Sequence, residues 1–598
     1  MFSIGRRLCA TLIVVATAAC TTTEPISSPA GDYLSGRLAA RERSVRVASD
    51  EFAAALAQSG PVDGIVGERA FFLHLAAGDF DRAVPLAQRL VAAAAAPDAE
   101  PTDGLPELTL AIEALRLGDF AAARARLEGA DFRRYLPSVA FLVDVWVEDG
   151  LNGPQAAIER LSAVPDGVFP SFNPLHNAFL AEKAGAEAAA GAAYEVSLRS
   201  FGGPVARRAY GAFLEREGKR DAAEEFYRLL RREPGPSRRA ARAGLRRLAR
   251  GQTSTDYAEV APAQGAAVAI YGFAGVILDQ INEEYDRSRA VGFEPDEPRY
   301  EAPLALAQLA IRLDPAMDEA RRLAGLIFAT YGDDDAARAV LAPIPPTSPQ
   351  YEQARVSLAQ ALVRQEKPDE AIALLRRTTA RDRNAEEARL ALSTILSNEG
   401  RQTEAVEVLS GLIERADVDE DDAWRFFVAR GAALLTLDRW EAAERDLIKA
   451  VDVAPEEPTA LNYLGYSWAE RGENLDEAFA LIEKAVALSP DNGAIVDSLG
   501  WAHYQRGDYA EAVVHLERAA SMEPADPTIT DHLGDVYWRL GRRVEARYQW
   551  RHALDLEPDA KLLAALEEKI AGGLAVRSED GSSDTAPAAA SERAARAD

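Results

Sequence analysis

Small and helix-breaking residues recur along the C-terminal third of the chain at a nearly constant interval. Four glycines stand 34, 35 and 34 residues apart, and each is followed in fixed register by two alanines and a proline. The glycines are Gly431, Gly465, Gly500 and Gly534; the alanines are Ala443, Ala478, Ala512 and Ala546, then Ala450, Ala485, Ala519 and Ala553; the prolines are Pro455, Pro490, Pro524 and Pro558. This period predicts helical hairpins that stack on one another.

One repeat shows why these residue types are needed. Gly500 is expected where the second helix of the hairpin approaches the first closely, with Ala512 as its small counterpart across the pair. Gly507 supplies a left-handed residue that ends the first helix, and Pro524 cannot continue the second. Each hairpin leaves an apolar face that only its neighbours can cover.

The pattern resembles the tetratricopeptide repeat (TPR), and a weaker form of it continues upstream. There, a glycine is followed five residues later by an alanine in five places: Gly78 and Ala83, Gly118 and Ala123, Gly218 and Ala223, Gly332 and Ala337, and Gly400 and Ala405. The resemblance implies an all-α protein, a superhelical solenoid of about ten to twelve helix pairs.

Changes in composition suggest how the chain is divided. We expect divergent N-terminal helical repeats over residues 33–250, a linker over 251–265, and C-terminal repeats with a cap helix over 266–570. Residues 571–598 carry small and charged side chains without a periodic apolar face, which predicts a disordered tail.

The N-terminus has the features of an export signal. Arg6 and Arg7 precede an apolar stretch too short to span a bilayer, and small residues stand directly before Cys20. This resembles the lipobox of bacterial lipoproteins, although Thr17 replaces the usual leucine. The prediction is a signal peptide over 1–19, a lipidated Cys20 with a flexible tether over 20–32, and an outer-membrane anchor facing the periplasm. Ordinary cleavage, which releases a free periplasmic protein, is the alternative.

Composition limits the function classes. The chain has 598 residues and a formal charge of -28, which disfavours nucleic acid and anionic lipid as ligands of the whole surface. It has six histidines, no H-E-x-x-H, no P-loop and no nucleophile elbow. We expect no enzyme activity, no metal and no cofactor, and we expect other proteins as partners.

In the TPR family, positions 2, 5, 9, 12 and 13 of the first helix line a concave groove. The resemblance places aromatic and charged residues there, which suit an extended or helical peptide. The predicted groove residues are Asn462, Tyr466, Asp497, Trp501, Tyr504, Asp531, Asp535, Trp538 and Arg539. An alternative is that Trp501 and Trp538 only pack between adjacent repeats.

Arginines crowd one short segment of this acidic chain. The basic patch comprises Arg238, Arg239, Arg242, Arg246, Arg247 and Arg250. It predicts either a docking site for an acidic partner or a phosphate-bearing cell-wall polymer, or a solvated helix that pairs with Glu224, Glu225 and Glu233.

The stretch from Leu461 to Tyr466 and the stretch from Ile495 to Trp501 are similar to the C-terminal repeats of certain outer-membrane TPR lipoproteins. Those proteins are adaptors of a periplasmic carboxyl-terminal processing protease. The resemblance implies a scaffold that recruits the protease and its substrates, among them peptidoglycan hydrolases. Assembly of an export apparatus for polysaccharide or protein is the alternative, and a cell-wall enzyme is a remote one.

Overall fold

The computed structural model describes residues 29–41, 44–59, 64–96, 101–290, 297–414 and 423–575. Over these residues the chain is all-α, with 30 α-helices and one short 3₁₀ helix and without β-strands. It divides into two compact units, an N-terminal unit up to Glu414 and a C-terminal unit from Arg415 onward. The predicted signal peptide and Cys20 lie outside the described residues.

The N-terminal unit holds the first 21 α-helices and the 3₁₀ helix. They are α2 (Pro29–Arg41), α3 (Val45–Ser59), α4 (Gly64–Ala77), α5 (Phe80–Ala94), α6 (Leu105–Arg116), α7 (Phe120–Glu128), α8 (Leu136–Asn152), α9 (Pro154–Ser162), η1 (Pro170–Phe172), α10 (Asn173–Lys183), α11 (Glu187–Phe201), α12 (Pro204–Arg216), α13 (Arg220–Leu230), α14 (Pro236–Ala249), α15 (Pro262–Ala290), α16 (Glu301–Leu313), α17 (Asp318–Thr330), α18 (Asp334–Leu341), α19 (Tyr351–Arg364), α20 (Pro368–Arg381) and α21 (Glu386–Asn398), followed by α22 (Gln402–Ile413).

The C-terminal unit is a regular stack of four hairpins and a final helix. Its elements are α23 (Trp424–Thr436), α24 (Trp440–Val453), α25 (Pro458–Arg471), α26 (Leu475–Leu488), α27 (Gly493–Arg506), α28 (Tyr509–Met522), α29 (Pro527–Arg539), α30 (Arg543–Asp555) and α31 (Ala560–Gly572). Each odd-numbered helix up to α29 packs mainly against the helix that follows it.

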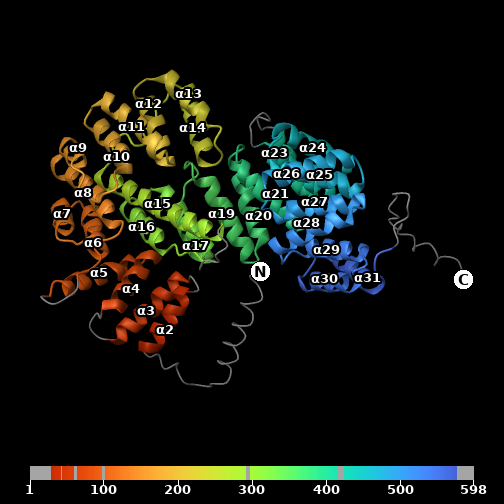
Figure 1. Ribbon diagram of the computed structural model, residues 1–598. Coiled ribbons are helices and arrows are strands. Elements are labelled where there is room, and N and C mark those ends of the chain that lie inside the picture. Colours follow the sequence, from red (N-terminus) through yellow and green to blue (C-terminus); the bar gives the residue numbers. More distant parts are fainter. Residues whose placement is uncertain are drawn as a thin grey trace, which may run out of the picture. The chain divides into compact units, whose positions relative to one another are not determined.

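In the N-terminal unit, the chain turns back on itself after α14. Helices α15 and α16 pack against α4, α6 and α8, which precede them by more than a hundred residues, and α15 also contacts α10. Figure 1 shows α15 and α16 inside the arc formed by α4 to α14. The inner face of these early repeats is therefore covered by a later part of the same chain.

Helix α15 fits this position because of its sequence. Its residues 266–270 are five consecutive apolar residues, and all five are buried. A helix that is apolar all round is stable only when protein surrounds it or when it crosses a membrane. By length and composition α15 passes as a membrane span. In the structure its first half lies in the core, whereas much of its second half, including Asp279 and Gln280, is exposed. A Cβ on Gly265 would lie 2.0 Å from a ring carbon of Trp146 on α8, so only glycine permits this close approach.

In the C-terminal unit, the predicted roles of the repeat glycines are confirmed. A Cβ on Gly500 would lie 2.6 Å from Leu516, and one on Gly465 would lie 2.7 Å from Ile482, both on the second helix of their hairpin. Ala512 and Ala519 are completely buried. Gly507 has a φ of 87° and ends α27 as predicted.

The observed boundaries differ from those expected from composition. The two units separate at Glu414 and not in the linker predicted at 251–265, because α15 packs into the preceding repeats and α16 continues them. Residues 262–265 of that linker are already helical. Helix α2 begins at Pro29, inside the segment expected to be a tether. The described helices also outnumber the expected ten to twelve pairs, because upstream hairpins such as α2 and α3 lack the glycine signal.

Candidate functional site

The nine predicted groove residues come from the first helices of three consecutive hairpins. Asn462 and Tyr466 lie on α25, three further residues lie on α27, and four lie on α29. The register of the repeat therefore brings them to equivalent positions, one helix after another. They differ in what already contacts them within the chain.

Three of the groove residues are aspartates, and all three are at least 95% buried. Asp497 accepts a hydrogen bond from His532 Nδ1 at 3.0 Å. Asp531 and Asp535 share Lys569 of α31, whose Nζ lies 2.7 Å from both oxygens of Asp531 and 2.9 Å from Asp535. Each buried carboxylate thus has a basic partner, as burial of a charge requires.

The shifts in pKa follow from this arrangement. Burial opposes a positive charge on His532, but the Asp497 carboxylate outweighs burial and raises the pKa of the imidazole. Burial likewise opposes the charge of Lys569, but Asp535 and Asp531 raise its pKa. Burial, together with the negative charge of Asp531, raises the pKa of Asp535 to about 6. The groove wall is therefore a network of coupled charges.

Of the two tryptophans, Trp501 packs against the next hairpin, as the alternative interpretation expected, whereas Trp538 packs against the second helix of its own hairpin. Trp501 stacks on Tyr504 of its own helix, with ring centroids 4.6 Å apart, and on His532 of the next hairpin at 4.0 Å. Trp538 packs against Trp550 at 5.3 Å. Both tryptophans are only partly buried, so each keeps some exposed ring surface beside its packing role.

The end of the chain covers the last hairpin of the groove. Besides Lys569, α31 leads to Gly573, where a Cβ would lie 1.9 Å from the ring of Trp538. Arg539 donates to the carbonyl oxygen of Ala575 at 2.6 Å and to Tyr504 Oη at 3.1 Å. The cap helix predicted from Asp559 to Ile570 is confirmed as α31. It and residues 573–575 occupy the groove positions of α29.

The groove surface of α25 and α27 is different. Asn462 Oδ1 and Trp501 Nε1 are buried atoms without a hydrogen-bond partner among the described residues. Tyr466 lies near them, where burial and the negative charges of Glu470, Asp497 and Asp531 raise its pKa well above the usual value, so that it stays a neutral hydroxyl. A buried polar atom left unpaired costs about 1–3 kcal/mol. One unpaired acceptor and one unpaired donor are therefore buried in the wall of this part of the groove.

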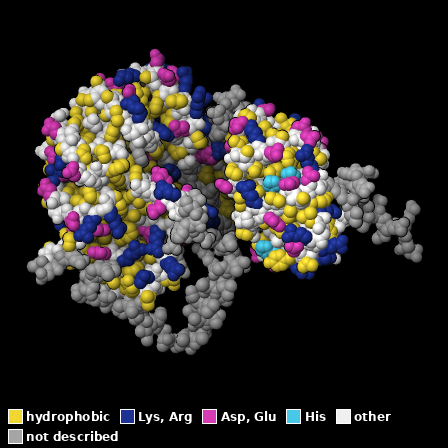
Figure 2. All heavy atoms as spheres, viewed as in Figure 1, with side chains coloured by type: hydrophobic (Ala, Val, Ile, Leu, Met, Phe, Trp, Pro, Cys, Tyr) yellow, Lys and Arg dark blue, Asp and Glu magenta, His cyan; other side chains and the backbone are white. Residues whose placement is uncertain are grey.

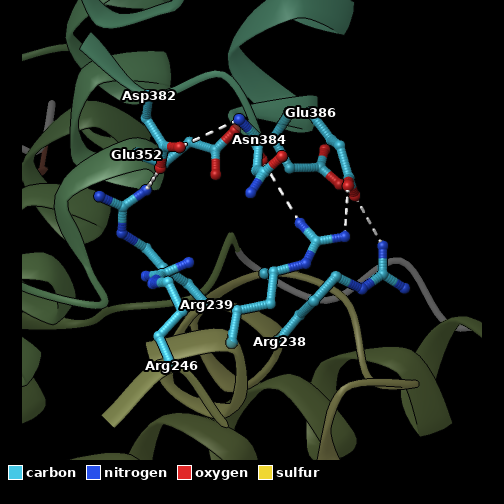
Figure 3. Close-up of a pocket in the computed structure, with 10 residues that line it drawn as sticks. Arg238, Arg239, Arg246, Glu352, Asp382, Asn384 and Glu386 are labelled. Carbon is cyan, nitrogen blue, oxygen red and sulfur yellow. Dashed lines mark hydrogen bonds and ion pairs between the residues drawn. The ribbon is translucent and has the colours of Figure 1, made fainter. Parts of the chain in front are cut away.

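The basic patch has a role that neither prediction anticipated. Arginine side chains of α14 reach toward α19, α21 and the turn after α20, and Figure 3 shows them facing Glu352, Asp382 and Glu386. Arg238, which is 4% exposed, and Arg242 both bind Glu386, at 2.9 and 2.6 Å. Arg239 pairs with Asp382.

The other three arginines of the basic patch differ in their surroundings. Arg247 binds Glu215 on α12 at 2.7 Å, whereas Arg246 and Arg250 are exposed. Helix α14 is therefore a packed element of the N-terminal unit, and its charges are largely neutralised by carboxylates of the same unit. The pairing with Glu224, Glu225 and Glu233 expected for a solvated helix is wrong for Arg238, Arg239 and Arg242.

Two important residues of the C-terminal unit were not anticipated, His532 and Lys569. The predicted groove contained three aspartates against one arginine, and this imbalance is a signal that a cation must lie nearby. On the face drawn in Figure 2, acidic, basic and histidine side chains are interspersed over the C-terminal unit. The described residues contain no cluster of three or more histidine, cysteine or acidic residues suited to a metal ion.

Comparison with known proteins agrees with the repeat pattern. Residues 356–420 and 428–493 match the family model of the tetratricopeptide repeat, and residues 500–541 match a second model described as TPR repeat. These three matched segments are tetratricopeptide repeats. A curated relative is the TPR repeat-containing protein PA4667 of Pseudomonas aeruginosa, to which it is 44% identical over 73 residues. That match spans 12% of this chain and 12% of the relative.

Solved structures of TPR proteins are also similar. A tetratricopeptide repeat protein from Parabacteroides merdae is 15% identical, with a TM-score of 0.35 over 42% of this chain and 97% of that one. The thermophilic TPR protein TTC0263 of Thermus thermophilus is 19% identical, with a TM-score of 0.28 over 31% and 99%. The Cut9-Hcn1 hetero-tetramer of the APC/C gives 14% identity and a TM-score of 0.37 over 91% and 96%.

Proposed function

We propose that this protein is a non-enzymatic, membrane-anchored scaffold of the periplasm that holds a partner protein in the open part of its C-terminal groove. TPR domains bind other proteins, and among the described residues α31 and residues 573–575 contact groove positions of α29 and not those of α25. The observation that carries the proposal is the pair of unpartnered buried atoms, Asn462 Oδ1 and Trp501 Nε1.

These two atoms match the chemistry of a peptide backbone. Asn462 Oδ1 accepts a hydrogen bond and Trp501 Nε1 donates one, so an extended segment satisfies both with an N–H and a C=O group. The free tryptophan ring surface and Tyr466 offer apolar contact beside them. Binding restores the hydrogen bonds that the unliganded groove lacks, which makes it favourable.

Photocrosslinking from two positions of the same helix tests this site. A photoreactive phenylalanine analogue is placed either at Tyr466, in the groove, or at Tyr463, which is 39% exposed elsewhere on α25. We expect a partner crosslinked in cells from position 466 and not from 463. The crosslink should weaken at least about tenfold when N462L and W501F are combined, since each removes one hydrogen bond. Equal yields at both positions, or no effect of the double variant, contradict the proposal.

The matched control for the double variant is Y548A. Tyr548 is 67% exposed on α30 and takes no part in the groove, so its loss should leave the crosslink unchanged. W501F retains the aromatic stacking on His532 and Tyr504, which limits the change to the N–H donor. Thermal melting of each variant separates a binding defect from unfolding.

The identity of the captured partner decides the finer function. A processing protease or a peptidoglycan hydrolase supports the adaptor role that the similarity of residues 461–501 implies. Components of an export apparatus support a role in assembly instead. Turnover of peptidoglycan by the purified chain alone contradicts the scaffold.

Anchoring through Cys20 is part of the same proposal and has its own test. We expect labelled palmitate to be incorporated into the wild-type protein and the protein to fractionate with the outer membrane. The C20A variant should lose the label and appear in the soluble periplasm. Soluble wild-type protein without label favours ordinary cleavage.

A further inference from the structure

The N-terminal unit contains a cavity of about 400 Å³ between α15 and the repeats that surround it. Its walls come from η1 and α10, the turn from α11 to α12, the middle of α15, and α17. The volume falls within the range of small-molecule sites, about 300–1,000 Å³. The cavity belongs to a different unit from the groove, so it is independent of the proposed function.

The cavity exists because glycines face it. Gly272 lies where a Cβ would be 2.9 Å from Phe172, so that side of the wall is tightly packed. Gly275, one turn further along α15, also lines the cavity, but no atom lies within 4 Å of its Cβ position. Glycine inside a helix costs roughly 0.5–1 kcal/mol relative to alanine. At Gly275 no neighbouring atom requires the absence of a side chain, so close packing does not account for the glycine. The effect of the glycine is to leave space open in the cavity.

The lining is mostly apolar, with a few polar groups. Phe172, Leu175, Val205, Val268 and Leu278 provide much of the apolar surface. Such a lining favours an apolar ligand over a peptide segment, because the N–H and C=O groups of a peptide would find few hydrogen-bond partners here.

The main polar feature of the cavity is a cation. Arg322 on α17 lines it, and its Nε is buried without a hydrogen-bond partner among the described residues. Nearby Tyr271 keeps its proton at neutral pH, since burial raises its pKa to about 12. The carboxylate of Asp279, also in the lining, is exposed. A guanidinium with an unused N–H donor matches a carboxylate.

We propose that this cavity binds a small amphiphile of the fatty-acid class, with the hydrocarbon chain in the apolar part and the carboxylate on Arg322. The hydrocarbon chain removes the apolar cavity lining from water, and the carboxylate pairs with the guanidinium of Arg322, which lines the cavity. The alternative occupant, an apolar side chain of a partner protein, offers no anion to this group.

Binding of dodecanoate to the purified full chain, measured by calorimetry below its micellar concentration, tests the proposal. We expect saturable binding of one molecule per chain. The variant G275F fills the open space from within the helix and should weaken binding at least tenfold. G411F is the matched control, because Gly411 is also a helical glycine of the N-terminal unit with open space at its Cβ position. It should bind like the wild type.

The role of Arg322 has a separate readout. R322M retains an apolar stem and should weaken dodecanoate binding about tenfold or more, whereas binding of dodecanol, which lacks the carboxylate, should hardly change. Thermal melting confirms that each variant is folded. Absence of saturable binding to the wild type, or equal binding by wild type and G275F, overturns the site. Equal loss of both probes in R322M overturns the assignment of the carboxylate to Arg322.

Discussion

The two units use the same helical hairpin but treat its concave face in opposite ways. In the N-terminal unit the inner face of the early repeats is covered by α15 and α16 of the same chain. In the described part of the C-terminal unit, α31 and residues 573–575 cover the last hairpin. A superhelix of repeats therefore does not by itself indicate an available groove.

The nature of the covering contact differs as well. Helix α15 is held by apolar burial, with residues 266–270 inside and Gly265 against Trp146. Helix α31 packs through Leu566, which is completely buried, and adds the ion pairs of Lys569 with two buried carboxylates. The cover of the C-terminal groove therefore depends partly on buried charges, whereas the cover of the N-terminal unit is apolar. Apart from the cavity beside α15, the N-terminal unit therefore covers its own inner face, which agrees with the proposal that a partner binds the C-terminal unit.

The largest expected effect comes from disturbing the contact between α15 and α8. The variant G265L places a side chain where the Trp146 ring already lies, and neither backbone nor a fully buried tryptophan has room to move. We expect the N-terminal unit to lose more than about 4 kcal/mol of stability, or to fail to fold. Hydrogen exchange of α8 and α15 in the full chain measures the loss.

G275L, on the same helix, is the control for G265L. Its side chain enters open space, so stability should change by less than about 1 kcal/mol. Equal stability of G265L and wild type would show that α15 does not pack against α8 in this way, and the contrast between the units would fail.

The sequence predicted the hairpins of the C-terminal unit well. The reason is that Gly465, Gly500 and their alanine partners answer local steric demands, which leave the same mark in every repeat. The nine groove residues fall on α25, α27 and α29 as predicted, because their positions follow from the same register.

The segments that cover the inner faces of the repeats could not be predicted from the repeat pattern. Contacts such as Gly265 with Trp146, or Arg238 with Glu386, join residues more than a hundred positions apart. They depend on how the chain returns, which a repeat period does not encode. The arginine run was therefore interpreted as a surface feature, although its acidic partners stand in the same sequence. Lys569 escaped notice because a cap helix was expected to face solvent.

The second prediction concerns the covered end of the open groove. K569M leaves two buried aspartates without their cation, and we expect the C-terminal unit to lose about 3 kcal/mol of stability. Helix α31 should exchange its amide hydrogens faster than in the wild type. The control is K561M, since Lys561 is exposed on the same helix and its loss should cost less than about 0.5 kcal/mol. Matching behaviour of the two variants would mean that α31 is held by packing, like α15.

The smallest expected effect is a difference between the two units in how their stability depends on pH. Glu352 on α19 lies beside the ion pairs of α14, and burial raises the pKa of its carboxyl from 4.5 to about 7, despite a hydrogen bond from Ala388 N–H at 3.0 Å. Between these values the folded state keeps a proton that the unfolded state has released. The neutral Glu352 carboxyl therefore makes its full contribution to the free energy of unfolding below about pH 4.5. This contribution is lost as the pH rises through 7. We expect the N-terminal unit to lose about 2 kcal/mol between pH 5 and pH 8.

The variant E352Q should remove that loss, because glutamine stays neutral and still accepts the hydrogen bond from Ala388. The C-terminal unit should remain pH-dependent in E352Q, since the raised pKa values of His532 and Asp535 also withdraw stability as the pH rises. Hydrogen exchange resolved by unit at pH 5 and pH 8 measures both, with E399Q at an exposed site as the control. An unchanged pH profile of the N-terminal unit in E352Q would show that Glu352 is not the titrating group. A changed pH profile in both units would show that the pH dependence of their stabilities is coupled. The two units would then no longer differ in their electrostatics.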